Sequence, residues 1–269
     1  MKKTALILSV ILSLCCFMTT ACQASYTDTV KFNSGEAMVI AHRGLSGLEI
    51  ENTDPAFIAA GERSYWGIEA DLRRTADGKY VICHDVDMKR VGGVDLKVKD
   101  STLEELMDVV LLDADGERNK DGTRLATLDS FISICKRYGK QAVLELNCDY
   151  TKEELGEILA IIDSHGYLDR VTFISFIYSN LLRVRALYPD AEAQFLFTEY
   201  SDEILQRLTD DRIDAAIAHS SVNRIIIDKF HAAGLKVNCW IVDVSIVAEQ
   251  LCFMGADYIT TNILEQKTK

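Results

Sequence analysis

The fold is decided by residues 38–85, which read MVIAHRGLSGLEIENTDPAFIAAGERSYWGIEADLRRTADGKYVICHD. This stretch contains three short apolar runs, Met38–Ala41, Trp66–Ile68 and Tyr80–Cys83. The runs are continuous and rich in β-forming residues rather than alternating with polar ones, which is the pattern of buried strands in a parallel sheet. Each run is followed or closed by a cluster of polar residues. The stretch therefore predicts parallel strands that carry polar side chains at their ends.

These clusters place two histidines, two acids and an arginine at strand ends, namely His42, Arg43, Glu69, Asp71 and His84. In a parallel α/β barrel, active sites lie at the carboxyl ends of the strands. Two histidines can act there as general base and general acid. Two acids spaced i, i+2 on a strand point to the same side and can hold a hard cation, while arginine can neutralise a phosphate oxygen. Together these groups indicate cleavage of a phosphodiester.

From Thr127 onward, predicted helices and strands alternate regularly, which is typical of a parallel sheet. Before this region, a helix is expected over residues 53–63, capped by Asn52 and Thr53. The chain has 269 residues, an ordinary length for a TIM-type (β/α)8 barrel, and it offers nine candidate strands for eight places. We expect residues 213–217 to be the extra run. The later predicted strands lie at 142–146, 171–175, 193–197, 213–217, 236–241 and 258–260.

On these motifs, the sequence resembles the glycerophosphodiester phosphodiesterase family, a branch of the phospholipase-C-like phosphodiesterase barrels. The resemblance covers residues 37–264 and is most specific near the N-terminus. The matching residues there are His42-Arg43-Gly44, Glu51-Asn52-Thr53, Ile68-Glu69 with Asp71, Thr75 with Asp77-Gly78, and His84-Asp85 with Arg90. The weaker matches are Glu145, Ser175-Phe176, Gly234-Leu235 before Trp240, and Gly255-Ala256-Asp257 before Ile259-Thr260.

The resemblance implies metal-dependent hydrolysis of glycerophosphodiesters to glycerol 3-phosphate and an alcohol. It also implies that the substrate's own glycerol hydroxyl attacks first to give a cyclic phosphate, with direct attack by water as the alternative. Glu145 adds a third acid, since a carboxylate in an apolar strand is costly unless it is paired or metal-bound. Oxygen ligands favour Ca²⁺ or Mg²⁺ over zinc. The expected site residues are the acid–base pair His42 and His84, the metal ligands Glu69, Asp71 and Glu145, and the phosphate and substrate contacts Arg43 and Trp240.

Residues 73–78, between the second and third predicted strands, are too few for a crossover helix, which needs about a dozen residues. The two strands are therefore either antiparallel or joined by an extended return without a helix. We expect the extended return, because the family pattern places Asp71 and His84 in one site. After the third strand, residues 86–126 lack the alternation and predict a small inserted lobe at the barrel mouth, which we expect to shape substrate specificity.

The N-terminus predicts export. Met1-Lys2-Lys3 is followed by an apolar run over residues 4–18, as in a signal peptide, and this run is short for a membrane span. Residues 19–22 resemble a bacterial lipobox in which Cys22 is lipidated; ordinary cleavage after Ala24 is the alternative. We therefore expect a signal within residues 1–24 and a barrel over 37–264. The protein would be a lipoprotein on the outer side of the cytoplasmic membrane, or otherwise secreted.

Composition limits the partners. The formal net charge of −12 argues against binding of nucleic acid and against a broad electrostatic attraction to anionic membranes. A small anionic glycerophosphodiester would instead depend on local cations. The cysteines show neither a CxxC motif nor the Cys/His spacing of a zinc site.

Two features depart from the family pattern, and one is the family's aspartate-rich ending after the last strand, which is altered here to Thr260-Thr261-Asn262. The other bears on the phosphate. Asn147 stands where the family carries a lysine, so a point charge near the phosphate is missing. Lys89, Arg90 or Lys97 of the inserted lobe could supply it. Two alternatives to the expected activity stay open. One is phospholipase-type cleavage of intact phospholipid, which needs an exposed apolar rim at the barrel mouth, and the other is a non-catalytic surface binding lipoprotein on the same barrel.

Overall fold

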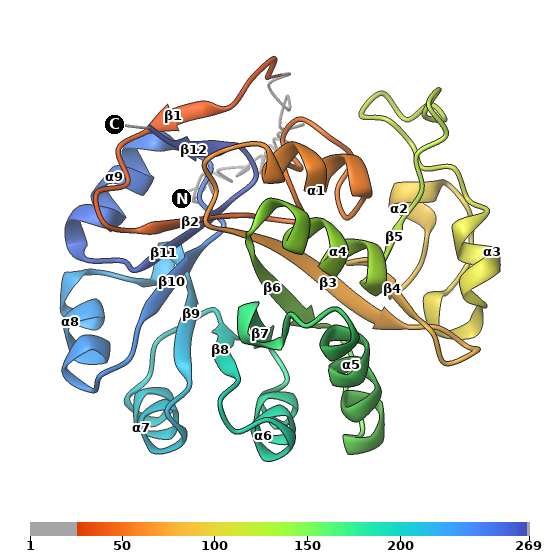
Figure 1. Ribbon diagram of the computed structural model, residues 1–269. Helices are drawn as coiled ribbons and strands as arrows, with labels where there is room; N and C mark the ends of the chain where they lie inside the picture. The colour runs from red at the N-terminus through yellow and green to blue at the C-terminus, as the bar shows by residue number, and fades with distance from the viewer. Residues whose placement is uncertain (1–25, 268–269) are drawn as a thin grey trace, which may run out of the picture.

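The computed structural model describes residues 26–267, which form a closed barrel surrounded by helices (Figure 1). The predicted signal and Cys22 lie outside the described residues. Eight parallel strands follow one another around the barrel, and the last pairs with the first. The TIM-type prediction is confirmed. In ring order the strands are β2 (Met38–Ala41), β3 (Gly67–Arg74), β6 (Gln141–Leu146), β7 (Val171–Ser175), β8 (Glu192–Phe197), β9 (Asp214–Ala218), β10 (Val237–Trp240) and β11 (Tyr258–Thr261).

Helices connect these strands and cover the outside of the barrel (Figure 1). Most begin at a polar cap whose side-chain oxygen accepts a hydrogen bond from the first turn, as Thr53, Thr127 and Thr151 do. The connecting helices are α1 (Asp54–Gly61), α4 (Leu128–Tyr138), α5 (Lys152–Ser164), α6 (Tyr178–Leu187), α7 (Asp202–Asp211), α8 (Arg224–Ala232) and α9 (Ser245–Met254). Short 3₁₀ turns η2 (Leu168–Arg170) and η3 (His219–Ser221) join some of them to the sheet.

Two strand predictions were wrong. The run at Tyr80–Ile82 forms β4, which pairs antiparallel with β3 through a tight turn and lies outside the ring. The extended return is therefore replaced by a hairpin, the arrangement that a short link permits between antiparallel strands. The run at 213–217, expected to be extra, is instead barrel strand β9, which pairs with β8 and β10. Most of its side chains are small, so its sequence only weakly indicates a strand. Hydrogen bonding to both β8 and β10 nevertheless makes it part of the ring.

The inserted lobe follows β4 and lies beside the barrel, at the right of Figure 1. It contains α2 (Lys89–Gly92), η1 (Val98–Asp100) and α3 (Leu103–Met107), and it ends in β5 (Ala126–Thr127), which pairs with β4. The lobe has its own apolar cluster, which includes Met88, Val98, Leu106 and Leu111 and continues onto Val81 of β4. This packing fixes the lobe against the hairpin and so places its residues beside the barrel mouth.

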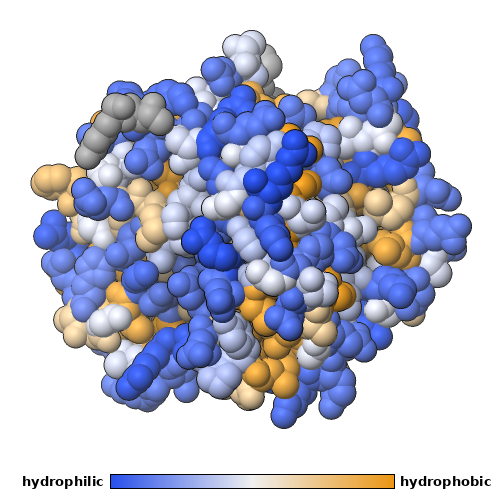
Figure 2. All heavy atoms as spheres, viewed as in Figure 1, coloured by the Kyte–Doolittle hydropathy of each residue, from blue (hydrophilic) through white to orange (hydrophobic). Residues whose placement is uncertain are grey.

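The barrel interior contains an apolar layer and, beside it, buried polar side chains such as Asn238, which donates to Gln194 and accepts from Thr260. One residue from each of several strands meets inside it, including Ile40, Val143, Ile174 and Leu196. Because side chains alternate along a strand, Glu145 points to the same side as Val143. The acidic groups therefore lie next to buried apolar side chains, which makes their charge costly. No helix within residues 26–267 is long and apolar enough to cross a membrane. The face drawn in Figure 2 is mainly hydrophilic, with apolar patches among the polar side chains.

A short parallel pair, β1 (Val30–Phe32) and β12 (Leu264–Gln266), ties the two ends of the described chain together. Glu265 is its polar anchor. Its carboxylate lies 2.6 Å from Lys31 Nζ and accepts hydrogen bonds from the hydroxyls of Thr29 and Ser64. Burial disfavours the charged carboxylate, but these partners outweigh that cost and lower the pKa of Glu265 to about 2.

Glu265→Gln is expected to reduce the free energy of unfolding by about 1–2 kcal/mol at pH 7, a value discounted for partial solvent screening. Because the pKa is depressed in the folded state, this stabilisation is present above the unfolded pKa near 4.5 and is lost as pH falls toward 2. Urea unfolding at pH 7 and pH 3 would measure it. A difference between wild type and variant that does not shrink at pH 3 would contradict the role of the charge.

Candidate active site

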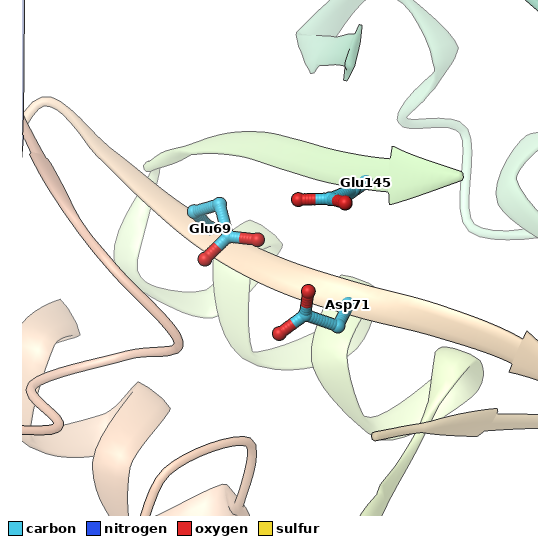
Figure 3. Close-up of side chains that lie close together, drawn as sticks. All are labelled: Glu69, Asp71 and Glu145. Carbon is cyan, nitrogen blue, oxygen red and sulfur yellow. The ribbon is translucent and has the colours of Figure 1, made fainter. Parts of the chain in front are cut away.

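Three carboxylates meet at the carboxyl end of the barrel. Glu69 and Asp71 lie two positions apart on β3, so they project on the same side of the strand. Glu145 on β6 pairs in register with Asp71. One oxygen from each carboxylate lies within 4.8 Å of the others, and Figure 3 shows the three groups gathered around a shared space. This group could hold a metal ion.

The raised pKa values of the group indicate that an added positive charge would stabilise its ionised carboxylates. Burial, together with the charges of Asp71 and Glu145, raises the pKa of Glu69 well above its ordinary value. Burial and then Asp71 raise the pKa of Glu145 to about 8. Glu69 Oε1 is buried and has no hydrogen-bond partner among the described residues. Arg43 offsets only part of the repulsion, and a divalent cation would satisfy the unpaired oxygen and favour the ionised acids.

Asp71 carries partners on both of its oxygens. Asn52 donates to Oδ2 and Asn147 donates to Oδ1, each over 2.8 Å. Asn147 therefore occupies the position of the family lysine as a neutral group that orients Asp71. The expectation that Asn52 caps α1 was wrong, since Thr53 is the cap and Asn52 contacts Asp71 instead. Asn52 can reach β3 because its backbone adopts φ 58°, a left-handed conformation that asparagine tolerates.

Arg43 lies at the centre of the charged groups. Its backbone N–H donates to Glu69 Oε2 over 2.7 Å, while its guanidinium lies 2.9 Å from Glu51 and 3.3 Å from Asp71. Arg43 has φ 54° and Gly44 has φ 75°. A Cβ on Gly44 would come within 2.7 Å of the backbone of α1, so only glycine fits this turn. The strained turn directs the Arg43 N–H and side chain into the same site.

His42 is held by a hydrogen-bond relay that the sequence did not indicate. Its Nδ1 lies 2.7 Å from Asn262 Oδ1, and the Asn262 amide donates to Asp243 Oδ2 over 2.6 Å. This chain orients Asn262 with its oxygen toward the imidazole, so Nδ1 carries the proton and Nε2 keeps its lone pair. His42 Nε2 lies 4.0 Å from Glu69 Oε2. Burial, followed by the charge of Arg43, lowers the pKa of His42.

His84 follows β4 and is half-exposed, in contrast to His42. Its Nδ1 lies 2.8 Å from Asp85 Oδ1, and Arg90 of α2 donates to Asp85 Oδ2 over 2.8 Å. Arg90 also makes two hydrogen bonds to Glu51, which pairs with Arg43. A continuous series of ion pairs and hydrogen bonds therefore connects Arg90 of the inserted lobe with His84 on one side and with Arg43 on the other.

Arg73 is a further residue that the sequence did not single out. It donates to the backbone oxygen of His84 through Nε over 2.9 Å and to that of Asn147 through Nη1 over 3.2 Å. It therefore ties the β4 hairpin to the end of β6. Of the lobe cations considered as substitutes for the family lysine, Lys89 pairs with Asp95, and Arg90 is the one that reaches the site.

Trp240 ends β10 at the barrel mouth. Its indole packs edge-on against Phe176, with ring centroids 5.6 Å apart, and its Nε1 has no hydrogen-bond partner among residues 26–267. The structure thus brings five of the seven expected site residues together: His42, Arg43 and the three acids. It connects His84 to Arg43 only through Asp85, Arg90 and Glu51, and it places Trp240 on β10, two strands from β2 around the ring. Of the three remaining histidines, His165 and His231 lie elsewhere beside acidic partners, whereas His219 on η3 lines a cavity together with Asn262, the partner of His42.

Replacing Arg90 with glutamine is expected to lower kcat/KM for a glycerophosphodiester by about tenfold, because charge-assisted hydrogen bonds that position Asp85 and Glu51 would be lost. Steady-state kinetics would measure the effect. Lys89→Gln is the matched control, since Lys89 lies next to Arg90 on α2 but pairs only with acids of the lobe. Equal kcat/KM losses in the two variants would mean that charge on the lobe, rather than the contact with Asp85, is responsible.

The chain matches the sequence profile of the glycerophosphoryl diester phosphodiesterase family over residues 42–266. It belongs to this family. It is 30% identical to YhdW of Bacillus subtilis over 233 residues, covering 83% of this chain and 93% of that protein. It is 28% identical to the glycerophosphodiester phosphodiesterase of Caldanaerobacter subterraneus subsp. tengcongensis over 84% of this chain and 94% of that enzyme.

Solved structures agree with this assignment. A phosphodiesterase of Oleispira antarctica, solved in complex with the product sn-glycerol-3-phosphate, superposes with a TM-score of 0.78 at 26% identity. The match covers 84% of this chain and 92% of that one. As a member of the family, the protein is a phosphoric diester hydrolase with glycerophosphodiester phosphodiesterase activity. This assignment argues against the alternative of a non-catalytic binding protein.

Proposed function

We propose that the protein hydrolyses glycerophosphodiesters to glycerol 3-phosphate and an alcohol, with His42 and His84 as the acid–base pair and a divalent cation held by Glu69, Asp71 and Glu145. The observation that carries the proposal is the meeting of three carboxylates, two of them buried, with His42 at the carboxyl end of the barrel. The Oleispira antarctica relative with its bound product supports glycerol 3-phosphate as the product here.

The donor set fits a hard cation. All three proposed ligands are carboxylates, which suit Ca²⁺ or Mg²⁺, and one buried oxygen of Glu69 has no hydrogen-bond partner in the described part of the chain. A cation held there would supply positive charge that offsets the charge developing at the phosphate during the reaction. Asn52 and Asn147 hold Asp71 in place by hydrogen bonds to its two oxygens, so the site is largely oriented by the protein itself.

His42 is the proposed general base. Asn262 fixes the tautomer in which Nε2 is unprotonated, and this nitrogen faces the acidic cluster. From there it can accept the proton of the attacking hydroxyl, whether this is the substrate's glycerol hydroxyl or water. Arg43 offers a guanidinium beside the same space, where it can pair with a phosphate oxygen.

His84 is the proposed general acid. Asp85 accepts from its Nδ1 and would stabilise the protonated imidazole, as a carboxylate does in other acid–base pairs. From the opposite nitrogen, His84 can donate a proton to the departing alkoxide. Its partial exposure lets it be reprotonated from solvent after each turnover.

The test is release of glycerol 3-phosphate from glycerophosphocholine by the protein without residues 1–24. The reaction would be run with Ca²⁺, with Mg²⁺ and with a chelator. We expect turnover with one of the cations and none with the chelator. Turnover that persists in chelator would contradict the metal-dependent mechanism, and a folded protein that turns over neither glycerophosphocholine nor other glycerophosphodiesters would contradict the proposed substrate class.

We also propose that the protein is exported and anchored through lipidated Cys22. The support is the signal-like sequence of residues 1–22, which lies outside the described residues. In a bacterial host, labelled fatty acid should be incorporated into the full chain but not into Cys22→Ser. A wild-type chain that takes up no label would contradict the anchor and leave secretion by cleavage after Ala24.

A further inference from the structure

The two most exposed large apolar side chains of residues 26–267 lie on neighbouring helices of the outer layer. Phe253 of α9 is 84% exposed and Ile225 of α8 is 70% exposed. Ile246 of α9, at 59%, precedes Phe253 by seven residues, or about two helical turns, so both lie on the same side of α9. Side chains exposed to this degree contribute nothing to the core, and only a contact outside the barrel would remove them from water.

These three side chains, Ile225, Ile246 and Phe253, form one surface, which we call the α8–α9 patch. Arg224 Nη1 donates to the backbone oxygen of Phe253 over 3.4 Å, so the first turn of α8 lies near the last turn of α9. Ile225 follows Arg224 in that turn. Both helices direct other side chains toward the barrel, namely Ile227, Phe230, Ala248 and Leu251, which are buried. The α8–α9 patch therefore faces outward.

The charges around the patch balance, although the chain as a whole is acidic. Within α8 and α9 the only acids are Asp228 and Glu249, and the only lysine and arginine are Lys229 and Arg224, so the two helices carry no formal net charge with histidine neutral. Asp228 pairs with Arg224 at 3.1 Å. An anionic lipid surface is therefore repelled less by this face than by the average surface of a chain with a net charge of −12.

The N-terminal end of the described chain lies beside the same helix. β1 contacts α9 (Figure 1), and the backbone N–H of Asn33, directly after β1, donates to Glu249 of α9 over 3.1 Å. Cys22 precedes Val30 of β1 by eight residues, so a lipid on Cys22 can lie at most about 28 Å from the start of β1. An anchor there would hold α9 close to the bilayer, at a high effective concentration.

From these observations we propose that the α8–α9 patch rests on the lipid bilayer when the chain is held there by its N-terminus. The inference rests on the proposed export and anchoring of the protein. Exposed aliphatic and aromatic side chains among balanced charges suit the boundary between lipid headgroups and acyl chains. A second copy of the chain fits less well, because a stable protein–protein interface buries about 800 Å² per partner, more than three side chains provide.

This orientation has a consequence for the active site. α8 and α9 cover the side of the barrel (Figure 1), whereas the candidate active site lies at the carboxyl ends of the strands. With its side against the bilayer, the barrel opens along the membrane surface rather than into it. The mouth then remains in contact with water, which suits a water-soluble glycerophosphodiester.

The experiment places a fluorescent reporter in the patch. Phe253→Trp would be tethered to vesicles of phosphatidylcholine and phosphatidylglycerol by a nickel-chelating lipid and an N-terminal hexahistidine tag that replaces residues 1–24. Lipids brominated near the headgroup boundary quench tryptophan emission on contact, and the quenching of the wild-type chain, which contains two tryptophans, is subtracted. Leu182→Trp is the matched control, because Leu182 is exposed on α6, which follows β7, three strands from β10 around the ring.

We expect brominated lipid to quench the introduced tryptophan of Phe253→Trp at least about twice as strongly as that of Leu182→Trp, because side chains of a surface-bound helix lie about 5–10 Å into the boundary. Ile246→Trp should behave like Phe253→Trp and covers the case in which that variant folds poorly. Equal quenching at the patch and on α6 would overturn the proposal. An emission change in Phe253→Trp that depends on protein concentration without vesicles would assign the patch to a second copy and overturn it as well.

The tag keeps this test separate from the proposed anchor. Because the tag replaces the lipid, quenching does not depend on whether Cys22 is lipidated. A chain that takes up no labelled fatty acid, but is quenched at the patch when tethered, would contradict the anchor alone. A chain that takes up the label but shows equal quenching at the patch and on α6 would contradict the bilayer contact alone.

Discussion

His42→Ala is expected to lower kcat for a glycerophosphodiester by about 10²–10⁴-fold, the range over which a positioned acid or base contributes. The reason is that Nε2 of His42 lies beside the acidic cluster with its tautomer fixed by Asn262. Alanine removes the base, and no other histidine in the described part of the chain lies next to Glu69. Steady-state release of glycerol 3-phosphate would measure the loss, and thermal unfolding would check that the variant is folded.

His165→Ala is the matched control for this substitution. His165 also lies beside an acid, with Asp129 at 3.2 Å, but both belong to the outer helical layer. Its replacement should leave kcat within about twofold of wild type. If His42→Ala kept more than about a tenth of wild-type kcat while His165→Ala behaved as expected, the proton transfer would have to be assigned to another group.

Glu145→Gln is expected to stabilise the metal-free protein and to abolish stabilisation by metal. The pKa of Glu145 is raised to about 8, so its folded form binds a proton more tightly than the unfolded chain. Stability of the metal-free wild type should therefore fall as pH rises from about 4.5 to about 8. At pH 8 the variant, which cannot ionise, should be more stable by about 2–4 kcal/mol.

Added Ca²⁺ or Mg²⁺ should offset most of this difference in stability. A cation at 100 times its dissociation constant stabilises the folded wild type by about 2.7 kcal/mol, and the variant should gain much less. Urea unfolding at pH 5 and pH 8, with cation or chelator, measures both effects without any assay of activity. Glu199→Gln, an exposed acid on the loop before α7, is the control. A metal-induced shift that remains full in Glu145→Gln would exclude Glu145 as a ligand.

The cluster of three carboxylates could be predicted because the residue pattern that indicates it lies within single strands. The i, i+2 spacing of Glu69 and Asp71 on one strand fixes their common side, and the pleat of a strand enforces this in any fold. Glu145 was predictable for a related reason, since an acid within an apolar strand is costly unless something binds it. The same locality explains why the regular alternation of helices and strands after Thr127 could be predicted from the sequence.

The two wrong strand predictions concern runs that could each have been one of the eight barrel strands. Residues 80–82 and 213–217 are short apolar runs of similar appearance, and periodicity alone does not say which belongs to the ring. The first run forms a hairpin with β3 and therefore lies outside the ring. The second run pairs with both β8 and β10 and is therefore a barrel strand. Hydrogen bonding between strands is a non-local property, so the choice depends on the closed sheet as a whole.

The sequence by itself determined the class of barrel, the strand-end acids and histidines, and the family. Only the tertiary structure decided what surrounds them. It brought Asn262 to His42, Asn147 to Asp71 and the lobe residue Arg90 to Glu51. Strand and helix signals come from neighbours within a few residues, whereas these contacts join residues from 39 to 220 positions apart, which only closure of the barrel brings within hydrogen-bond distance.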